Sequence, residues 1–233
     1  METLWNEKEA SEFESDPLLM RVYTSRLLGA NPDLILHGGG NTSVKQSVVN
    51  FFGETEELLY VKGSGCDLAT IEEQNFAPVR LETLIRMADM EALSDTEMVY
   101  QQRAAMTDPG APNPSVEAIL HALIPFRYVE HTHADAVLGV TNQPRGEESV
   151  QEIYGNRVIV IPYVMPGFIL ARKVRELTQD KNWEDYEGMI LMKHGIFTFA
   201  DNARESYEKM IELVTLAENF LKDRKALGRL ARG

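Results

Sequence analysis

Residues 127–142, RYVEHTHADAVLGVTN, pass from a β-type run to a helical pattern within a few positions. The first part predicts a strand over 127–132, and the spacing of apolar residues in the second part predicts a helix over 134–142. The same order then repeats, with a strand expected over 157–162 and a helix over 167–179. Strands that alternate with helices in this way predict an α/β fold.

The regions on either side of this stretch supply further elements. Asp16 and Pro17 provide the N-cap and the first turn of a helix over 17–29. The other expected elements are strands over 42–52 and 58–61, helices from 94 to about 106 and from 115 to 125, a strand pair over 188–200, and a long helix from 202 to about 227. Because no linker, repeat or low-complexity tract divides the chain, we expect residues 1–233 to form a single domain.

The composition is acidic and otherwise ordinary for a globular protein. The 233 residues carry 36 Asp and Glu against 23 Lys and Arg, a formal net charge of −13. Nucleic acids and anionic membranes need clustered positive charge, so we expect neither as the main partner. The single cysteine excludes an internal disulfide and a thiolate zinc cluster. With neither a signal peptide nor an apolar run of roughly 18 residues, the chain is expected to be soluble and cytoplasmic.

The five histidines include a pair with metal-binding spacing. His131 and His133 are at positions i and i+2 where the predicted strand ends, and strand geometry puts such side chains on one face. His194 is at a predicted turn, where a strand end could bring it beside the pair. Three neutral imidazoles with an open position form the usual ligand set of a catalytic divalent metal, most often zinc. The alternative is that this His-x-His pair is packing or surface decoration.

Glu117 is a candidate catalytic carboxylate. It is expected one turn into the helix that Ser115 caps, where it is either a solvated helix-start residue or a general base beside a metal. His121 follows four residues later on the same helix face, either as a partner behind the metal ligands or as a core histidine.

Two glycine turns have the composition of anion-binding loops. They are GGGNTS at 38–43 and KGSG at 62–65. Glycines let backbone N–H groups approach a phosphate, and a serine at a helix N-terminus, here Ser115, adds another donor. Neither turn is a P-loop or a dinucleotide fingerprint, so nucleotide binding is not supported. The alternative is that both are only tight turns.

Five short motifs occur in a fixed order: GNTS at 40–43, GSG at 63–65, PSVE at 114–117, HTHAD at 131–135 and KHG at 193–195. This ordered set resembles the class II aldolase/adducin family. Two longer stretches, VKGSGCDLAT at 61–70 and IYGNR at 153–157, are similar to the aldolase half of bifunctional rhamnulose-phosphate aldolase/dehydrogenase proteins. The 233 residues match the aldolase unit alone in length, and they carry no nicotinamide fingerprint.

The resemblance implies a three-layer α/β/α fold around a mainly antiparallel sheet, assembled as a homotetramer with active sites at subunit interfaces. It implies that zinc, or another divalent metal, binds to His131, His133 and His194, and that Glu117 is the acid/base. The residues that would hold the phosphate of dihydroxyacetone phosphate are Gly40, Asn41, Ser64, Gly65 and Ser115.

Two further points follow from the resemblance. Val116 stands where fuculose-phosphate aldolases have a second phosphate-binding serine, so the pose of the phosphate is expected to differ. A tyrosine of a neighbouring subunit often protonates the aldehyde oxygen in this family, and Tyr154 and Tyr163 are the candidates.

The function implied is metal-dependent cleavage of a sugar phosphate. The substrate would be a ketose 1-phosphate of the rhamnulose or fuculose type, and the products dihydroxyacetone phosphate and lactaldehyde. Two other enzymes on the same scaffold, a pentulose-phosphate 4-epimerase and a sugar-acid-phosphate decarboxylase, stay open as alternatives. A non-catalytic, adducin-like interaction domain is the third alternative.

Overall fold

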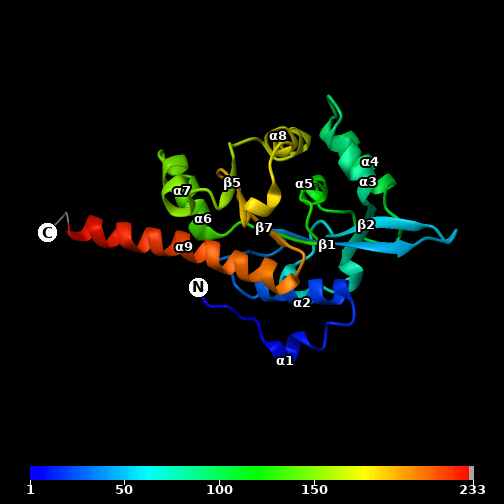
Figure 1. The fold of residues 1–233 in the computed structure, drawn as a ribbon, viewed down its shortest axis with the longest axis horizontal. Coiled ribbons are helices and arrows are strands. Elements are labelled where there is room, and N and C mark those ends of the chain that lie inside the picture. Colours follow the sequence, from blue (N-terminus) through cyan, green and yellow to red (C-terminus); the bar gives the residue numbers. More distant parts are fainter. Residues whose placement is uncertain (231–233) are drawn as a thin grey trace.

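The computed structural model describes the backbone of residues 1–230 and the side chains of residues 1–225. Within them, seven strands form one sheet in the order β3-β2-β1-β4-β7-β6-β5 (Figure 1). The strands are β1 (Asn41–Val49), β2 (Thr55–Lys62), β3 (Phe76–Arg80), β4 (Tyr128–Thr132), β5 (Val158–Ile161), β6 (Gly188–Leu191) and β7 (Gly195–Ala200). Only β5 and β6 pair in parallel within this sheet of described residues, so the expected mainly antiparallel sheet is confirmed.

Helices cover both faces of the sheet (Figure 1), so the three-layer arrangement is confirmed. One face carries α2 (Pro17–Gly29), α6 (Asp135–Thr141), α7 (Gly146–Tyr154) and α9 (Ala203–Leu230), and the other carries α3 (Leu81–Ala88), α5 (Ala118–Leu123) and α8 (Phe168–Thr178). The remaining helices are α1 (Glu7–Ala10), α4 (Asp95–Ala104) and single 3₁₀ turns at Leu68–Thr70, Glu73–Asn75 and Trp183–Asp185. None of the helices described through residue 230 is long and apolar enough to cross a membrane.

Most predicted elements are present, with differences at their ends. The first long strand stops at Val49 rather than at residue 52, because Asn50 starts a turn. Its Oδ1 accepts hydrogen bonds from the backbone N–H of Phe52 (2.9 Å) and of Glu54 (3.0 Å). Gly53 completes this turn with a φ of +81°, in the left-handed region that favours glycine. The structure also contains β3, α3 and α7, which the sequence pattern did not predict.

β4 is the strand on which the site is built. It lies between β1 and β7, and its register places His131 opposite Asn41 on one side and Phe197 on the other. Successive side chains of a strand point to opposite faces. His131 therefore points towards α5 and α8, whereas Glu130 points towards α2 and α9.

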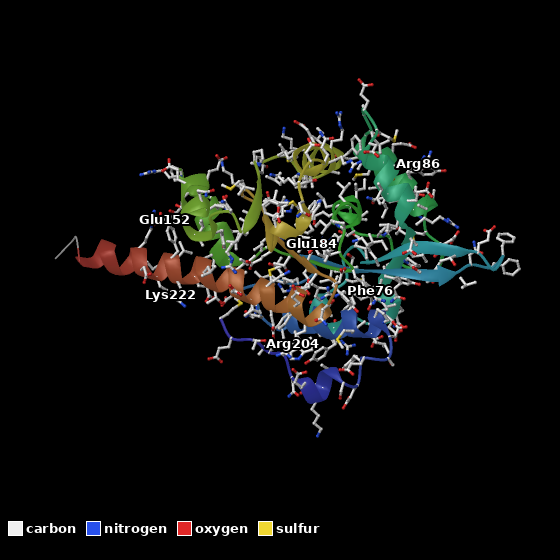
Figure 2. All side chains as sticks on the ribbon, viewed as in Figure 1. Phe76, Arg86, Glu152, Glu184, Arg204 and Lys222 are labelled. Carbon is white, nitrogen blue, oxygen red and sulfur yellow. The ribbon has the colours of Figure 1, made fainter. Side chains whose placement is uncertain are left out.

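Apolar side chains fill both spaces between sheet and helices (Figure 2). The layer on the α9 side contains Val22, Leu28, Ile190, Ile196, Met210 and Val214. The layer on the α5 side contains Leu120, Val129, Leu170, Val174, Phe197 and Phe199. Each such burial stabilises the fold by about 1.5–3 kcal/mol. The two layers hold β4 rigidly from both sides.

A buried ion pair supports β4 from the α2 side. Nη2 of Arg21 lies 2.7 Å from Oε1 of Glu130, and both side chains are fully buried. The guanidinium also lies 5.7 Å from the ring centre of Tyr128. The Thr198 hydroxyl lies 3.4 Å from Oε2 of Glu130 and 3.0 Å from the Ser206 carbonyl, the nearer of its two acceptors. Glu130 thus faces an opposite charge inside the protein, while burial still raises its pKa, and Nε and Nη1 of Arg21 have no hydrogen-bond partner among the described residues.

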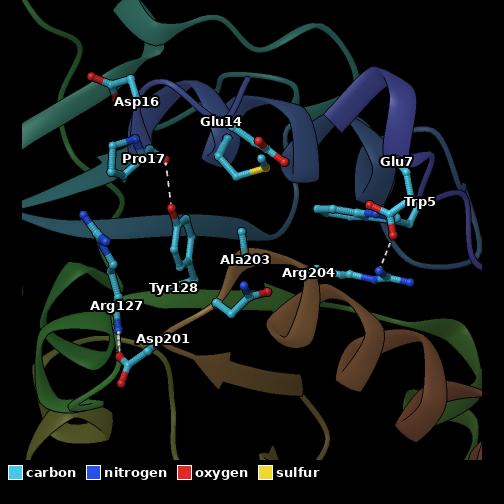
Figure 3. A pocket seen from close by; sticks show the side chains of 12 residues that line it. Trp5, Glu7, Glu14, Asp16, Pro17, Arg127, Tyr128, Asp201, Ala203 and Arg204 are labelled. Carbon is cyan, nitrogen blue, oxygen red and sulfur yellow. Dashed lines mark hydrogen bonds and ion pairs between the residues drawn. The ribbon is translucent and has the colours of Figure 1, made fainter. Parts of the chain in front are cut away.

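A pocket of about 490 Å³ lies where β4 begins, between the N-terminal segment and the start of α9 (Figure 3). In its lining, Arg204 forms an ion pair with Glu7, the Tyr128 hydroxyl donates to the Pro17 carbonyl at 3.4 Å, and Asp201 Oδ1 accepts the backbone N–H of Arg127 at 3.0 Å. The first contact attaches the N-terminal segment to α9, and the second attaches the start of α2 to β4.

Candidate metal centre

Three histidines meet where β4 ends. One ligand atom from each of His131, His133 and His194 lies within 4.8 Å of the other two. His131 belongs to β4, His133 follows the last residue of that strand, and His194 lies in the turn between β6 and β7. We call these three residues the histidine cluster. Their predicted convergence on one point is confirmed.

The β6–β7 turn places the third imidazole. The backbone of Lys193 has a φ of +61°, a left-handed conformation that reverses the chain, and the His194 N–H donates to the Leu191 carbonyl at 3.1 Å. Gly195 leaves room for the other two rings. A Cβ at this position would lie 2.9 Å from Cε1 of His131 and 3.3 Å from Cδ2 of His133.

The hydrogen bonds of the cluster leave ring nitrogens free. Nδ1 of His131 lies 3.1 Å from the carbonyl oxygen of Ile196. Because a carbonyl only accepts, this nitrogen carries the hydrogen and Nε2 keeps its lone pair. Among the described residues, Nε2 of His131, Nε2 of His133 and Nδ1 of His194 are buried and have no hydrogen-bond partner.

Two imidazoles of the histidine cluster, His131 and His133, are neutral at pH 7 because their pKa values are lowered. Burial lowers the pKa of His131 well below its usual value, and the neighbouring His133 and His194 lower it further. Burial, together with His194, also lowers the pKa of His133. Neutral imidazole is the form that binds a metal, and buried nitrogens without a partner are otherwise costly. The three residues therefore fit a divalent metal.

Glu117 lies against the histidine cluster. Its Oε1 is 3.3 Å from Nε2 of His194, and its Oε2 is 3.5 Å from Nε2 of His131. The residue is only 8% exposed, so the alternative of a solvated carboxylate is wrong. Its predicted place one turn into a helix is also wrong, since Glu117 is the N-cap residue of α5. The reason is that Oγ of Ser115 accepts the Glu117 N–H at 3.3 Å and holds the preceding residues in a turn.

Asn41 connects three of the predicted site residues. Its Nδ2 donates to Oε2 of Glu117 at 2.7 Å and to Oγ of Ser115 at 3.1 Å. On the other end of the same amide, Oδ1 contacts Nε2 of His121, which is fully buried in α5. His121 therefore contacts Glu117 indirectly, through Asn41.

The two glycine turns lie side by side. A Cβ at Gly38 would lie 3.3 Å from the carbonyl oxygen of Gly65, and Nζ of Lys62 donates to the Gly38 carbonyl at 2.7 Å. Gly40 and Gly65 have φ angles of +59° and +79°, which glycine adopts without strain. At Gly40 a Cβ would also approach the carbonyl oxygen of His131 to 2.8 Å.

The segment that contains Ser115 joins these turns. The Ser64 N–H donates to the Asn113 carbonyl at 2.7 Å, and the Ser115 N–H donates to the Lys62 carbonyl at 3.0 Å. The five residues predicted to hold phosphate thus lie on three adjoining segments of the chain. They are Gly40, Asn41, Ser64, Gly65 and Ser115.

Lys62 is a residue that sequence reasoning did not single out. It is 3% exposed and lies next to both glycine turns. Burial lowers the pKa of its ammonium group, although nearby Cys66, Asp67 and Glu117 act in the opposite direction. A lysine directly before a glycine-rich turn was the available signal. The sequence could not show that this strand end turns inward.

The structure separates the two candidate tyrosines. Tyr154 is 3% exposed, and its hydroxyl donates to the Leu213 carbonyl at 3.0 Å, between α7 and α9. It packs in the core, so its proposed role as a proton donor to a neighbouring subunit is wrong. Tyr163 is 53% exposed, and its ring centre lies 6.0 Å from Nζ of Lys193, the residue before His194. Tyr163 stays a candidate.

Comparison with known proteins identifies the family. The family described as class II aldolase and adducin N-terminal domain matches residues 21–221. The chain therefore belongs to this family, as its ordered motifs predicted.

Individual relatives agree with this assignment. The N-terminal class II aldolase domain of a conserved protein from Thermoplasma acidophilum is 39% identical, with a TM-score of 0.85 over 95% of this chain and 99% of that one. YuxG of Bacillus subtilis (strain 168), named an uncharacterized oxidoreductase, is 34% identical over 95% of this chain and 32% of YuxG. The chain thus spans about a third of that curated relative. The L-fuculose-1-phosphate aldolase of Thermus thermophilus, 18% identical, shares the fold with a TM-score of 0.59 over 91% of this chain and 97% of that one.

Proposed function

We propose that this chain is a metal-dependent aldolase that cleaves a ketose 1-phosphate of the rhamnulose or fuculose type into dihydroxyacetone phosphate and lactaldehyde. The observation that carries the proposal is the buried carboxylate of Glu117, which lies 3.3 Å and 3.5 Å from two imidazoles of the histidine cluster. A proton-transferring group beside a Lewis acid is what this cleavage needs.

Each part of the site has a proposed task. The histidine cluster would hold zinc or another divalent metal. When bound, the metal would supply a Lewis acid that stabilises the negative charge left on the ketose oxygens when the C3–C4 bond breaks. Glu117 would return a proton to the carbon that carries this charge, or remove it in the reverse direction. The exposed Tyr163 is the candidate to protonate the aldehyde oxygen.

The phosphate would be held by the glycine turns and Ser115. In the structure the Asn41 amide donates within the protein to Glu117 and Ser115, and the Ser64 N–H donates to the Asn113 carbonyl, so we expect the backbone N–H groups of Gly40 and Gly65 and the exposed Ser64 hydroxyl to contribute more. A net charge of −13 repels a sugar phosphate at long range. Binding therefore depends on local donors and on the ammonium group of Lys62.

The likeness of residues 61–70 and 153–157 to bifunctional rhamnulose-phosphate aldolase/dehydrogenase proteins favours rhamnulose 1-phosphate within this class. The match to YuxG covers 32% of that protein, as expected if YuxG contains an aldolase unit together with a second unit. We propose that the residues described here are the aldolase unit.

The test is an assay of the zinc-loaded protein on a panel of ketose 1-phosphates, with dihydroxyacetone phosphate detected through a coupled reductase. Release from rhamnulose 1-phosphate, lost after chelation and restored by zinc, would support the proposal. Release from none of them by the metal-loaded protein would contradict it. The same samples should then be assayed for 4-epimerase and decarboxylase activity.

We also propose that the chain forms a homo-oligomer, with a tetramer as the family expectation. The β1–β2 hairpin projects from the body of the molecule (Figure 1), and its turn carries Phe51 and Phe52, which are 97% and 81% exposed. Exposed aromatic pairs of this kind are typical of contacts between subunits. Light scattering should show an oligomer that Phe51→Ser/Phe52→Ser weakens, whereas a monomeric wild type would contradict the proposal.

A further inference from the structure

His121 is a fully buried imidazole with both ring nitrogens engaged. Nδ1 lies 2.8 Å from the hydroxyl oxygen of Ser43, and Nε2 contacts Oδ1 of Asn41. His121 belongs to α5, and Ser43 and Asn41 both belong to β1. The contacts therefore connect a helix to the strand beside β4.

These hydrogen bonds continue from Asn41 to the carboxylate of Glu117, and this end fixes the direction of each one. Nδ2 of Asn41 donates to Oε2 of Glu117 and to Oγ of Ser115, so its Oδ1 faces His121. Because Oδ1 only accepts, Nε2 of His121 carries the hydrogen. Burial lowers the pKa of His121 well below its usual value, so the ring is neutral, and Nδ1 accepts the hydrogen of the Ser43 hydroxyl.

The two carboxylate oxygens of Glu117 have different environments. Oε2 is held by Asn41 at 2.7 Å. Oε1 is buried and has no hydrogen-bond partner among the described residues. One oxygen is thus held by a hydrogen bond, whereas the other lies 3.3 Å from Nε2 of His194 without one.

We propose that His121 is a positioning residue, which acts through Asn41 to hold Oε2 of Glu117 and leaves Oε1 to transfer the proton. The proposal rests on the aldolase function given above. In the direction that makes the nucleophile, the C–H bond next to the carbonyl breaks, its proton passes to Oε1, and its electron pair stays on the substrate. In the cleavage direction Oε1–H returns this proton to the same carbon.

Neighbouring side chains hold His121 and Asn41 in place. Nζ of Lys45 donates to the carbonyl oxygens of His121, Ile124 and Phe126, at 2.9, 2.7 and 2.7 Å, and so caps the C-terminal end of α5. The ring of Phe197 lies 5.3 Å from the ring of His121 and 4.2 Å from that of His131, between centres. The imidazole of His121 therefore has little freedom to turn away from Asn41.

The first test reads the tautomer and does not depend on activity. Long-range ¹H–¹⁵N spectra of the full chain should show His121 with a protonated Nε2 and an unprotonated Nδ1 at pH 7. A ring protonated at Nδ1, or at both nitrogens, would overturn the proposal even if the protein proves to be an aldolase.

The second test compares two substitutions of His121. Gln places an amide N–H close to the position of Nε2, whereas Leu has a similar volume and no donor. We expect His121→Leu to lower kcat by about 10–100-fold at unchanged KM and zinc content, and His121→Gln to keep most of the wild-type kcat. Exchange of the dihydroxyacetone phosphate proton with D₂O should fall by the same factor as kcat.

The outcomes separate the two proposals. Wild-type kcat in His121→Leu, or equal losses in both variants, would overturn the positioning role while leaving the aldolase function intact. A wild type that is inactive on every ketose phosphate would overturn the proposed function. The tautomer of His121 would still decide whether its Nε2–H donates to Asn41. If His121→Leu fails to fold, the tautomer and the His121→Gln variant carry the test.

Discussion

The buried polar groups on the two faces of β4 differ in the partners that they have within the chain. On the face towards α2, Glu130 is paired with the opposite charge of Arg21 at 2.7 Å, although Nε and Nη1 of Arg21 have no hydrogen-bond partner among the described residues. On the face towards α5, His131 keeps a buried nitrogen without a partner among the described residues, and so do His133 and His194. Of these two adjacent strand residues, Glu130 thus faces an opposite charge, whereas Nε2 of His131 has no hydrogen-bond partner.

The difference distinguishes a structural site from one made to bind. The ion pair brings opposite charges together within the chain, whereas the histidine cluster brings three imidazoles together, which is the donor set that a divalent cation takes. We therefore expect substitutions in the histidine cluster to change metal binding and turnover more than stability. Substitutions on the α2 side should do the reverse.

The largest effect is expected at the metal ligands. His133→Ala removes one of three imidazoles, so the protein should lose bound zinc and all measurable dihydroxyacetone phosphate release while keeping its fold. Elemental analysis and circular dichroism measure both properties on one sample. Wild-type zinc content in this variant would place the metal elsewhere.

Glu117→Gln should separate chemistry from metal binding. The amide keeps the size of the side chain but cannot transfer the proton, so we expect kcat to fall about 10²–10⁴-fold with zinc content unchanged. Glu147→Gln, an exposed position on α7, is the matched control. Full activity of Glu117→Gln would remove Glu117 from the mechanism.

On the other face, Arg21→Met should cost stability. It leaves the Glu130 carboxylate buried without its partner, which lowers the free energy of unfolding by about 3–5 kcal/mol. The double variant Arg21→Met/Glu130→Leu removes both charges and should recover most of this loss. Urea denaturation measures both variants, and equal stability of Arg21→Met and wild type would show that the ion pair does not support β4.

A smaller effect is expected in the pH dependence of stability. Burial lowers the folded-state pKa of His121 below its unfolded value of about 6.5. As pH falls below 6.5, the unfolded chain takes up a proton that the folded chain does not, so the free energy of unfolding falls by about 1.4 kcal/mol per pH unit from this residue. His121→Gln lacks this proton uptake and should lose stability less steeply between pH 6.5 and 5. Equal slopes in metal-free samples would contradict the burial of a neutral imidazole.

The sequence predicted the residues of the histidine cluster better than the contacts that hold Glu117 beside them. The spacing of His131 and His133, and the turn at His194, depend on local geometry, so the pattern was sufficient. The contacts of Asn41 with Glu117 and His121 depend on the register of β1 against β4 and on the position of α5, which no local pattern contains.

The missed elements have similar causes. β3 contains Pro78, which argues against a strand in sequence but is tolerated because β3 is at the edge of the sheet. α7 starts at Gly146 without a side-chain cap, so its beginning carries no clear signal.

The central claim is that the histidine cluster and Glu117 together move a proton on dihydroxyacetone phosphate. Its most direct test is incubation of the zinc-loaded protein with this product in D₂O, followed by ¹H NMR. We predict that a single deuterium enters at the carbon bearing the free hydroxyl, and that chelation or Glu117→Gln abolishes the exchange. No exchange by the fully metal-loaded wild type would contradict the claim.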